Sequence, residues 1–269
     1  MKYSALVVSE QDTGEYSSQI KELDTADLPE GDLLIKVSYS SVNFKDALSF
    51  SGNKGVTQTY PHTPGIDAVG EVVESTDNAL PVGTKVVVTG YDLGMNTSGG
   101  FGEYIRVPSE WVIKLPENLP EKEAVAWGTA GLTAALCVDK LINNHVSKAK
   151  PILVSGATGG VGSIAISLLS KLGYQVHALT SKIDKVAYLK ALGAQDVVLR
   201  DDFIDESKRP LLKPMYSGAV DVAGGPVLAS ILKTLDYQGS VACCGLVASP
   251  ALNTTVLPFI LRDISLLGV

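Results

Sequence analysis

The feature that most constrains the fold of this chain is a glycine-rich stretch, PILVSGATGGVGSIAI, at residues 151–166. It begins with a short apolar run that predicts a strand at 151–155, and an apolar helical pattern continues over 162–172. Between them lie four glycines: Gly156, Gly159, Gly160 and Gly162. A tight turn that needs positive φ accounts for one or two of these, but not for all four. The order strand, glycine turn, helix instead predicts that backbone N–H groups at a helix N-terminus bind a pyrophosphate.

Close approach explains why glycine is needed in this turn. A Cβ would hold the phosphates away from the backbone, whereas Gly162 would let the helix pack closely on the strand. A glycine pattern alone is weak evidence, but between a strand and a helix it strongly favours a bound dinucleotide. The residues expected to hold it are Thr158, Gly159, Gly160, Val161 and Gly162.

The second half of the chain alternates between strands and helices. Further strands are expected at 175–179, 197–199, 219–222, 240–244 and 264–269, and further helices at about 184–192 and 227–235. Such alternation predicts a parallel sheet with helices on both faces. The chain stops inside the last expected strand, whereas a doubly wound sheet normally continues. We therefore expect a C-terminal portion to be missing.

The first half has a different pattern. Short β-rich segments bounded by Gly, Pro or Asp occur at 3–8, 33–42, 68–74, 85–89 and 103–107. They favour a partly barrel-like β domain over parallel βαβ units. A helical segment at 121–137 follows Pro120. The predicted fold class is therefore α/β, with a partly open β-barrel domain at 1–122 and a Rossmann doubly wound parallel-sheet cofactor domain at 123–269.

The end of the second parallel strand indicates which dinucleotide binds. An NAD site usually has an acid there, about twenty residues beyond the glycines, that holds the ribose 2′-hydroxyl. Here the strand runs into Thr180, Ser181 and Lys182, and no acid occurs before Asp184. Two hydroxyls and a lysine suit a 2′-phosphate, which needs donors and positive charge. We therefore favour NADPH/NADP+ over NADH.

Two basic residues further along, Lys185 and Arg200, are candidates for additional contacts to that phosphate. The alternative is a solvated turn in which Ser181 or Asp184 caps the following helix. Both interpretations can hold together.

Composition excludes several classes of protein. The formal net charge is −7, and Lys and Arg never form a basic block, so nucleic acid is not an expected partner. No run of 18 or more apolar residues occurs, so no membrane span is expected. The three cysteines, Cys137, Cys243 and Cys244, form no C-x-x-C pair. A disulfide framework is therefore not expected, and a reducing cytoplasm fits this pattern.

Five segments carry a family resemblance: SSVNFKDAL (40–48), PGIDAVGEV (64–72), WGTAGLTAALCV (127–138), SGATGGVGSIAI (155–166) and PFILRDISLLGV (258–269). With them the chain resembles the medium-chain dehydrogenase/reductase superfamily, and within it the acryloyl-CoA reductase group, also called YhdH/YhfP-type quinone oxidoreductases. The resemblance covers essentially the whole chain. It implies that the β domain is GroES-like and that the protein is a homodimer. The apolar end ISLLGV is a candidate for the pairing edge.

The resemblance also predicts that no metal is bound. Zinc-dependent relatives have a cysteine where this chain has Asn43, and a histidine where it has Ile66 before Asp67. The structural-zinc lobe with its four cysteines is absent as well. The three histidines, His62, His145 and His177, lack the spacing of a ligand set. We expect His62 to lie on a loop with a satisfied or solvated ring.

The resemblance implies further site residues. Asn43 and Phe44 would position the substrate and the nicotinamide, and most relatives have a tyrosine in place of Phe44. Asn43 would donate to a carbonyl oxygen, or it would cap the helix that begins at Phe44. Lys45 and Asp46 either take part in binding or form that helix's solvated face.

Three more residues are implied beside the nicotinamide: Thr129, Leu246 and Ile260. For Thr129 the alternative is a hydroxyl bonded back to its own helix. For Ile260 a place in the core is the safer interpretation. Cys243 and Cys244 are expected to be buried and unreactive, and Asp221 to satisfy turn backbone.

Without zinc, the expected chemistry is hydride transfer to a conjugated carbon. NADPH would give its hydride to the β-carbon, and the enolate would then need hydrogen-bond donors and a proton. The most favoured substrate is acryloyl-CoA, reduced to propanoyl-CoA; the alternative is a quinone or enone. The phosphates of CoA would need a basic rim, for which Lys45, Lys54 and Arg262 are candidates. A third reading is an NADPH-binding protein without turnover.

Overall fold

Antiparallel strands form the N-terminal unit, Met1–Thr129, in a computed structural model that describes residues 1–269. Its larger sheet has the strand order β6-β3-β4-β5-β7. These strands are β3 (Leu33–Tyr39), β4 (Asp67–Ser75), β5 (Lys85–Thr89), β6 (Tyr104–Val107) and β7 (Val112–Lys114). β6 and β7 do not pair with each other, so the barrel is only partly closed. This arrangement confirms the predicted partly open β domain.

Inward-facing residues of four of these strands make the core of the unit. In β5, for example, Val86 and Val88 are buried while Lys85 is exposed, which is the period-two pattern of a half-buried strand. The other strand residues in this core are Leu33, Ile35, Ala68, Val72, Ile105 and Val107. A separate hairpin pairs β1 (Lys2–Glu10) with β2 (Tyr16–Asp24). Short helical segments complete the unit: η1 (Thr25–Asp27), α1 (Phe44–Phe50) and η2 (Ser109–Trp111).

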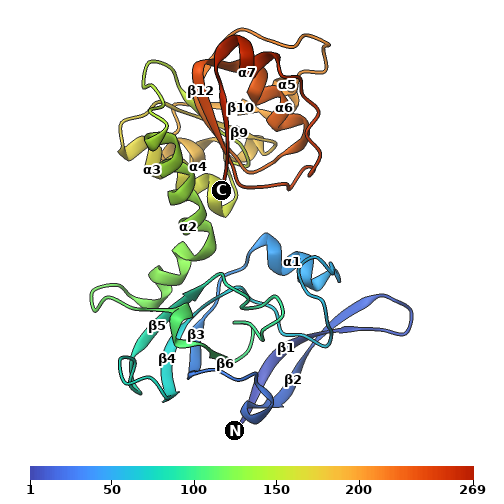
Figure 1. Cartoon of the computed structure of the whole chain (residues 1–269), viewed down its shortest axis with the longest axis vertical. Coiled ribbons are helices and arrows are strands. Elements are labelled where there is room, and N and C mark those ends of the chain that lie inside the picture. Colours follow the sequence, from blue (N-terminus) through green and yellow to red (C-terminus); the bar gives the residue numbers. More distant parts are fainter. The chain divides into compact units, whose positions relative to one another are not determined.

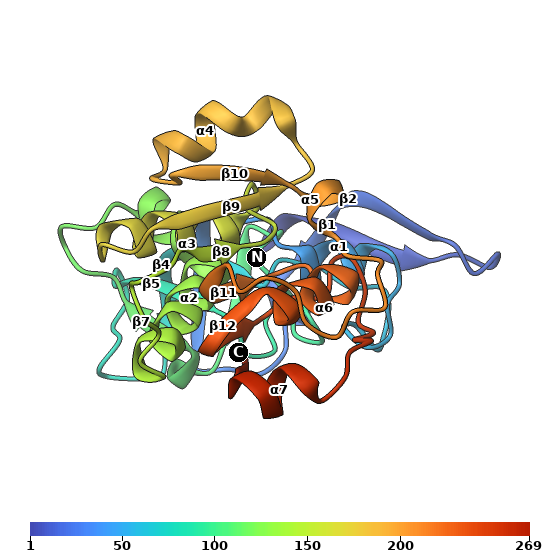
Figure 2. The same ribbon diagram turned by 90° about the horizontal axis from the view of Figure 1, so that it is seen from above.

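The C-terminal unit, Ala130–Val269, contains a six-stranded sheet in which every pairing is parallel. Its strand order is β10-β9-β8-β11-β12-β13, and Figure 2 shows β10 to β12 following one another in this sequence. The strands are β8 (Ile152–Val154), β9 (Val176–Thr180), β10 (Asp196–Leu199), β11 (Tyr216–Asp221), β12 (Leu235–Cys243) and β13 (Ser265–Gly268). Numbered within the sheet, the order is 3-2-1-4-5-6, which is that of the Rossmann fold.

Helices cover both faces of this sheet because its strands are apolar on both sides. The helices are α2 (Glu121–Asn143), α3 (Gly160–Lys171), α4 (Val186–Ala191), α5 (Arg200–Phe203), α6 (Gly225–Thr234) and α7 (Leu257–Arg262), with η3 (Ile183–Lys185) before α4 (Figure 1). Ile152 and Val154 pack with α2, α3 and α4, whereas Leu153 between them packs with α6. The predicted doubly wound sheet is therefore confirmed.

The boundary between the two units lies inside α2, between Thr129 and Ala130. The sequence placed it near the start of that helix, at 122/123. Gly128 has φ 40° and ψ −149°, so the helix is interrupted just before the boundary. The sequence pattern could not show this, because a glycine inside an apolar helical run has several explanations.

α2 passes one test that the sequence analysis did not anticipate. It has 23 residues and a mean hydropathy of 1.3 in its most apolar window, so length and composition alone would let it cross a membrane. Core helices pass the same test. Four of its apolar residues, Ala134, Cys137, Val138 and Leu141, are buried in the core of the C-terminal unit, which accounts for its composition.

The sequence missed two strands. β2 has the polar sequence YSSQIKELD and is largely exposed, so it has no apolar alternation and is defined only by its nine pairs with β1. β7 has only three residues. In addition, the strand expected at 33–42 ends at Tyr39, and the hydroxyls of Ser40 and Ser41 that follow it donate to Asp67.

Candidate functional site

A cavity of about 310 Å³ lies at the carboxyl ends of the parallel strands in the C-terminal unit. In an open α/β sheet this edge is where ligands bind. Its lining comes from the segments after five strands: Ser155, Gly156, Thr158 and Gly159 after β8; Leu179 to Lys182 at β9; Arg200 after β10; Val222, Ala223 and Val227 after β11; and Val247 and Ala248 after β12. The structure thus brings together six predicted cofactor residues: Thr158, Gly159, Thr180, Ser181, Lys182 and Arg200.

The four glycines of the turn have different roles. Gly156 has φ +56°, which a residue with a side chain rarely adopts. A Cβ on Gly162 would lie 2.4 Å from the Gly156 carbonyl oxygen, and one on Gly160 would lie 2.9 Å from Ala130 Cβ. Gly162 and Gly160 are therefore required for packing. Gly159 has ordinary φ, and a Cβ on it would meet only one atom, the Gly156 carbonyl oxygen at 3.3 Å, so its methyl would lie at the cavity with a single close neighbour.

A buried carboxylate, Asp221, fixes the cavity wall beside this turn. Asp221 accepts hydrogen bonds from Ser155 Oγ (2.6 Å) and from the backbone N–H groups of Ala223 (3.3 Å) and Gly224 (2.8 Å). Ser155 Oγ in turn accepts from Val222 N–H (2.9 Å). Burial raises the pKa of Asp221. The structure agrees with the expectation that Asp221 satisfies turn backbone.

The part of the cavity formed by β9 and β10 presents hydroxyls and positive charge. Lys182 is exposed, and its N–H donates to Thr180 Oγ1 (3.1 Å). The Arg200 guanidinium forms an ion pair with the Asp201 carboxylate (2.9 Å), and its side chain remains about half exposed. Lys185 is paired with Asp184 (2.9 Å), and neither of them lines the cavity. No Asp or Glu lines the cavity at all, so it offers no partner for a ribose 2′-hydroxyl of the kind an NAD site usually has.

Several predicted cofactor residues lie outside this cavity. Gly160, Val161 and Gly162 begin α3, where Gly162 is buried. Leu246 is 50% exposed, and its neighbours Val247 and Ala248 line the cavity in its place. Ile260 is 68% exposed on α7, so a place in the core is wrong for it.

A second polar cluster lies in the N-terminal unit around Asp67, the first residue of β4. Its carboxylate is fully buried and accepts hydrogen bonds from the Ser41 hydroxyl, from Asn43 Nδ2 (2.8 Å) and from Thr129, through both its N–H (3.0 Å) and its Oγ1 (2.8 Å). Asn43 Nδ2 also donates to Ser41 Oγ (2.9 Å). Two predicted site residues, Asn43 and Thr129, therefore meet on one carboxylate.

Thr129 reaches Asp67 because of the interruption at Gly128. A Cβ on Gly128 would lie 2.5 Å from Asp67 Oδ2, so only glycine lets α2 approach the carboxylate. The Thr129 hydroxyl is bonded to Asp67 instead of back to its own helix, so the back-bonding interpretation is wrong. Neither Asp67 nor Ser41 was among the site residues expected from the sequence.

Asn43 also caps α1, as expected. It forms a capping box with Asp46, whose carboxylate accepts from Asn43 N–H (2.7 Å) and Ile66 N–H (3.0 Å). Asp46 is 1% exposed and burial raises its pKa, so it does not belong to a solvated face. Lys45 and Phe44 are exposed, the latter by 49%.

His62 differs from its predicted state. It is 7% exposed, and its Nε2 has no hydrogen-bond partner. Its backbone pairs with Val8, which draws the segment onto β1 and buries the ring. Burial lowers the pKa of this imidazole. The sequence gave no sign of this, because the contact joins residues far apart in the chain.

The residues present do not fit a zinc centre. No three His, Cys, Asp or Glu side chains are grouped so that they could hold a metal ion. Both oxygens of Asp67 are already occupied by hydroxyl, amide and backbone donors. The three cysteines are free, and burial raises the pKa of Cys243.

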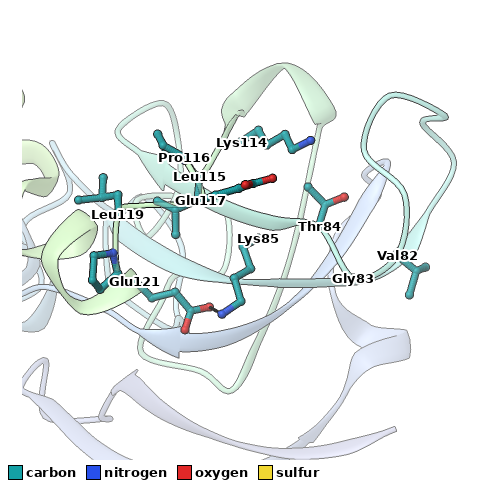
Figure 3. Close-up of a pocket in the computed structure, with 11 residues that line it drawn as sticks. Val82, Gly83, Thr84, Lys85, Lys114, Leu115, Pro116, Glu117, Leu119 and Glu121 are labelled. Carbon is teal, nitrogen blue, oxygen red and sulfur yellow. Dashed lines mark ion pairs between the residues drawn. The ribbon is translucent and has the colours of Figure 1, made fainter.

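Three further cavities lie in the N-terminal unit, and two of them exceed 400 Å³. One, of about 650 Å³, is predominantly apolar and adjoins α1, with a lining of Leu6, Val42, Asp46, Ala47, Phe50, Ser51 and Phe101. The other, of about 480 Å³, is shown in Figure 3, where Lys85 and Glu121 point toward each other across 3.6 Å. This second cavity contains none of the predicted site residues.

Comparisons with known proteins agree with the fold. The family described as alcohol dehydrogenase GroES-like domain matches residues 29–117, and the family described as zinc-binding dehydrogenase matches residues 160–269. The chain belongs to the medium-chain dehydrogenase/reductase superfamily, in the YhdH/YhfP and acryloyl-CoA reductase group, and is an oxidoreductase of that group.

Individual relatives are similar over most of their length. The chain is 46% identical to YhfP of Bacillus subtilis, which is named as a quinone oxidoreductase, with 97% of this chain and 79% of that protein covered. It is 41% identical to the acrylyl-CoA reductase AcuI of Ruegeria pomeroyi, with 99% and 82% covered.

Two solved structures are as similar to the chain as these relatives are. The yhdH oxidoreductase of Salmonella enterica in complex with NADP has a TM-score of 0.94 at 43% identity, and covers 100% of this chain and 82% of its own. The YhfP structure from Bacillus subtilis, with NAD bound, has a TM-score of 0.93 at 45% identity and the same coverage. Relatives this similar are thus known with both dinucleotides.

Proposed function

We propose that the protein is an NADPH-dependent reductase of activated C=C bonds that works without zinc. The observation that carries the proposal is the cavity at the carboxyl ends of the parallel strands, where Thr180, Ser181, Lys182 and Arg200 meet and no carboxylate is present. A 2′-phosphate needs such donors and positive charge, whereas a 2′-hydroxyl is usually held by an acid. The NADP-bound yhdH structure supports this choice.

The residues of the cavity have separable tasks in binding. Gly159 lets the pyrophosphate approach the first N–H groups of α3, where the helix dipole favours negative charge. Lys182 and Arg200 neutralise the 2′-phosphate, for which Arg200 turns from Asp201. Bound NADPH supplies the hydride for reduction of the substrate. From the family resemblance we also propose that Asn43, Phe44 and Thr129 take part in the site, and the exposed ring of Phe44 offers an apolar surface for packing.

The favoured substrate is acryloyl-CoA, reduced to propanoyl-CoA; the name of AcuI supports it. Hydride addition at the β-carbon leaves an enolate, whose α-carbon takes a proton from water or a side chain. The apolar cavity beside α1 suits a short acyl chain.

One observation favours the alternative substrate class, a quinone or another enone. Two of the three basic residues expected to bind CoA phosphates are already committed. Arg262 is 8% exposed and donates to three backbone carbonyls, and Lys54 is paired with Glu10 (2.9 Å). Only Lys45 stays free of ion pairs. A quinone needs no basic rim, and the name of YhfP agrees with this class.

The test follows NADPH absorbance with acryloyl-CoA or a simple quinone as acceptor, with NADH run alongside. Fast oxidation with acryloyl-CoA and a strong preference for NADPH are expected. Rapid turnover with quinone only would assign the second class, and NADPH binding without turnover of either acceptor would assign a binding protein. A chelator should leave the rate unchanged. We also propose that the protein is a cytoplasmic homodimer.

A further inference from the structure

The cofactor cavity lies where the two halves of the parallel sheet meet. β8, β9 and β10 form one half and β11, β12 and β13 the other, and β8 and β11 are neighbours although they are far apart in sequence. In a sheet of this order a dinucleotide lies across the crevice between the halves, with one mononucleotide on each. Thr180, Ser181 and Lys182 lie at the end of β9, so the proposed site of the 2′-phosphate belongs to the first half. The nicotinamide mononucleotide then falls to the second half.

Two buried side chains join the halves at this edge of the sheet. Ser155 directly follows β8, Asp221 is the last residue of β11, and both are 0% exposed. Ser155 Oγ donates to Asp221 Oδ1 (2.6 Å) and accepts from the Val222 N–H (2.9 Å). A serine hydroxyl has a single hydrogen, and this one is given to the carboxylate. Although Ser155 lines the cavity, its hydroxyl therefore has no hydrogen left to donate to a phosphate.

Asp221 extends this connection to the wall of the cavity. Its carboxylate accepts from the N–H groups of Ala223 (3.3 Å) and Gly224 (2.8 Å), which fixes the turn after β11. The Ala223 carbonyl oxygen in turn accepts from the Ala248 N–H (2.8 Å), in the segment after β12. Ala223 and Ala248 both line the cavity. A continuous series of hydrogen bonds therefore leads from the start of the glycine turn to the wall of the second half.

We infer that Ser155 and Asp221 are a pair of positioning residues, which hold the wall for the nicotinamide mononucleotide in place relative to the glycine turn. This inference rests on the proposed function. The pair acts through the backbone of 222–224, because its hydrogen-bonding groups are taken up within the pair and the turn. A ligand confined to the first half should therefore be insensitive to the pair, whereas a ligand that spans both halves should depend on it.

Two ligands separate the halves in an experiment. 2′,5′-ADP contains only the adenosine and its two phosphates, so it needs the first half, whereas NADP+ needs both. Calorimetry measures the affinity of each ligand, and the ratio of the two affinities is compared between variants. Ser155→Ala leaves the Val222 N–H without its acceptor and the Asp221 carboxylate without its hydroxyl donor. It should weaken NADP+ binding about tenfold, the effect of one buried polar group left unpaired, and 2′,5′-ADP binding less than about twofold.

Ser240→Ala is the matched control. Ser240 is also 0% exposed, lies on β12 of the same sheet and accepts a hydrogen bond from the Asn144 amide, but it does not line the cavity. Both variants should lower the melting temperature, whereas only Ser155→Ala should change the affinity ratio. Asp221→Asn is a second test, because its amide has one acceptor oxygen where the carboxylate has two. It should change the ratio in the same direction as Ser155→Ala.

Each outcome decides between the inference and its alternatives. The inference is overturned if Ser155→Ala weakens both ligands equally, because general damage to the unit then explains the result. It is also overturned if NADP+ binding is unchanged, or if Ser240→Ala shifts the ratio as much. If Ser155→Ala does not fold, Asp221→Asn decides by the same criteria, and if neither folds, the pair is a requirement of folding and the inference fails. Absence of binding of both ligands to wild type refutes the proposed function instead.

Discussion

Two glycines of the turn should respond differently to replacement by alanine: the Gly162 variant should lose stability, and the Gly159 variant should lose affinity for NADPH. In Gly162→Ala the new Cβ lies 2.4 Å from the Gly156 carbonyl oxygen, 2.8 Å from its carbonyl carbon and 2.9 Å from Ala157 Cα. Carbon–oxygen contacts in proteins normally begin near about 3.3 Å. The overlap is thus close to 1 Å, and backbone atoms cannot rotate away from it.

The size of the effect follows from two opposing terms. Alanine favours a helix over glycine by about 1 kcal/mol. Overpacking against rigid neighbours costs about 1–3 kcal/mol and sometimes more, and the depth of this overlap places it at the upper end. The expected net loss is about 2 kcal/mol in the free energy of unfolding. For a unit of this size, that lowers the melting temperature by about 4–8 °C.

Gly159→Ala should leave stability nearly unchanged. Gly159 has φ −82° and ψ 172°, which alanine adopts freely, and only the Gly156 oxygen at 3.3 Å is near its Cβ. Loss of the glycine N-cap costs less than about 1 kcal/mol. Its methyl, however, enters the cavity where the pyrophosphate is proposed to lie. We expect NADPH to bind at least about tenfold more weakly, or about 1.4 kcal/mol.

Thermal unfolding by circular dichroism and titration of NADPH fluorescence measure the two quantities on the same samples. Gly162→Ala should melt early, and Gly159→Ala should melt normally and bind poorly. The assignment of roles is refuted if Gly162→Ala is as stable as wild type, or if Gly159→Ala binds NADPH normally.

Three further changes have defined outcomes. Lys182→Ala should weaken NADPH binding about tenfold and leave NADH binding unchanged, because an exposed lysine contributes one charge-assisted hydrogen bond to the 2′-phosphate. Titration with each cofactor measures this, and equal losses for both would contradict it. His62 has a lowered pKa when folded, so the unfolded chain binds more protons below about pH 6.5 and stability falls as the pH drops. His62→Leu should flatten the pH dependence of the free energy of unfolding, measured by urea titration from pH 8 to 5, and an unchanged slope would exclude His62 as its source. Leu266 is 37% exposed on the edge strand β13, so Leu266→Lys should convert the proposed homodimer to monomers in light scattering, whereas a persistent dimer would place the interface elsewhere.

Local patterns were sufficient to predict most of the fold. The parallel sheet could be predicted because strands alternate with helical patterns, two of which end at a stop signal, Gly173 after α3 and Gly193 after α4. The strand conformation of β2 could not be predicted in this way. Its residues are polar and exposed, and its strand conformation comes entirely from pairing with β1. The burial of His62 is likewise a consequence of long-range pairing.

The sequence identified the cofactor cavity better than the Asp67 cluster, and the reason is physical. Thr180, Ser181 and Lys182 are consecutive, so their meeting needs only the end of one strand. Asp67 is 24 residues from Asn43 and 62 from Thr129. Only the folded β domain and the interruption at Gly128 bring these together.

The residue types in such a cluster do not determine whether its side chains offer a hydrogen-bond donor or an acceptor to a ligand. An amide and a hydroxyl each contain both donor and acceptor atoms, so Asn43 and Thr129 alone are compatible with binding either a carbonyl or an NH group. In this structure the buried carboxylate of Asp67 and the Ser41 hydroxyl engage the amide hydrogens of Asn43. The role of Asn43 toward a substrate stays a prediction. In any site built from such residues, the charged group behind them decides which ligand atoms they recognise.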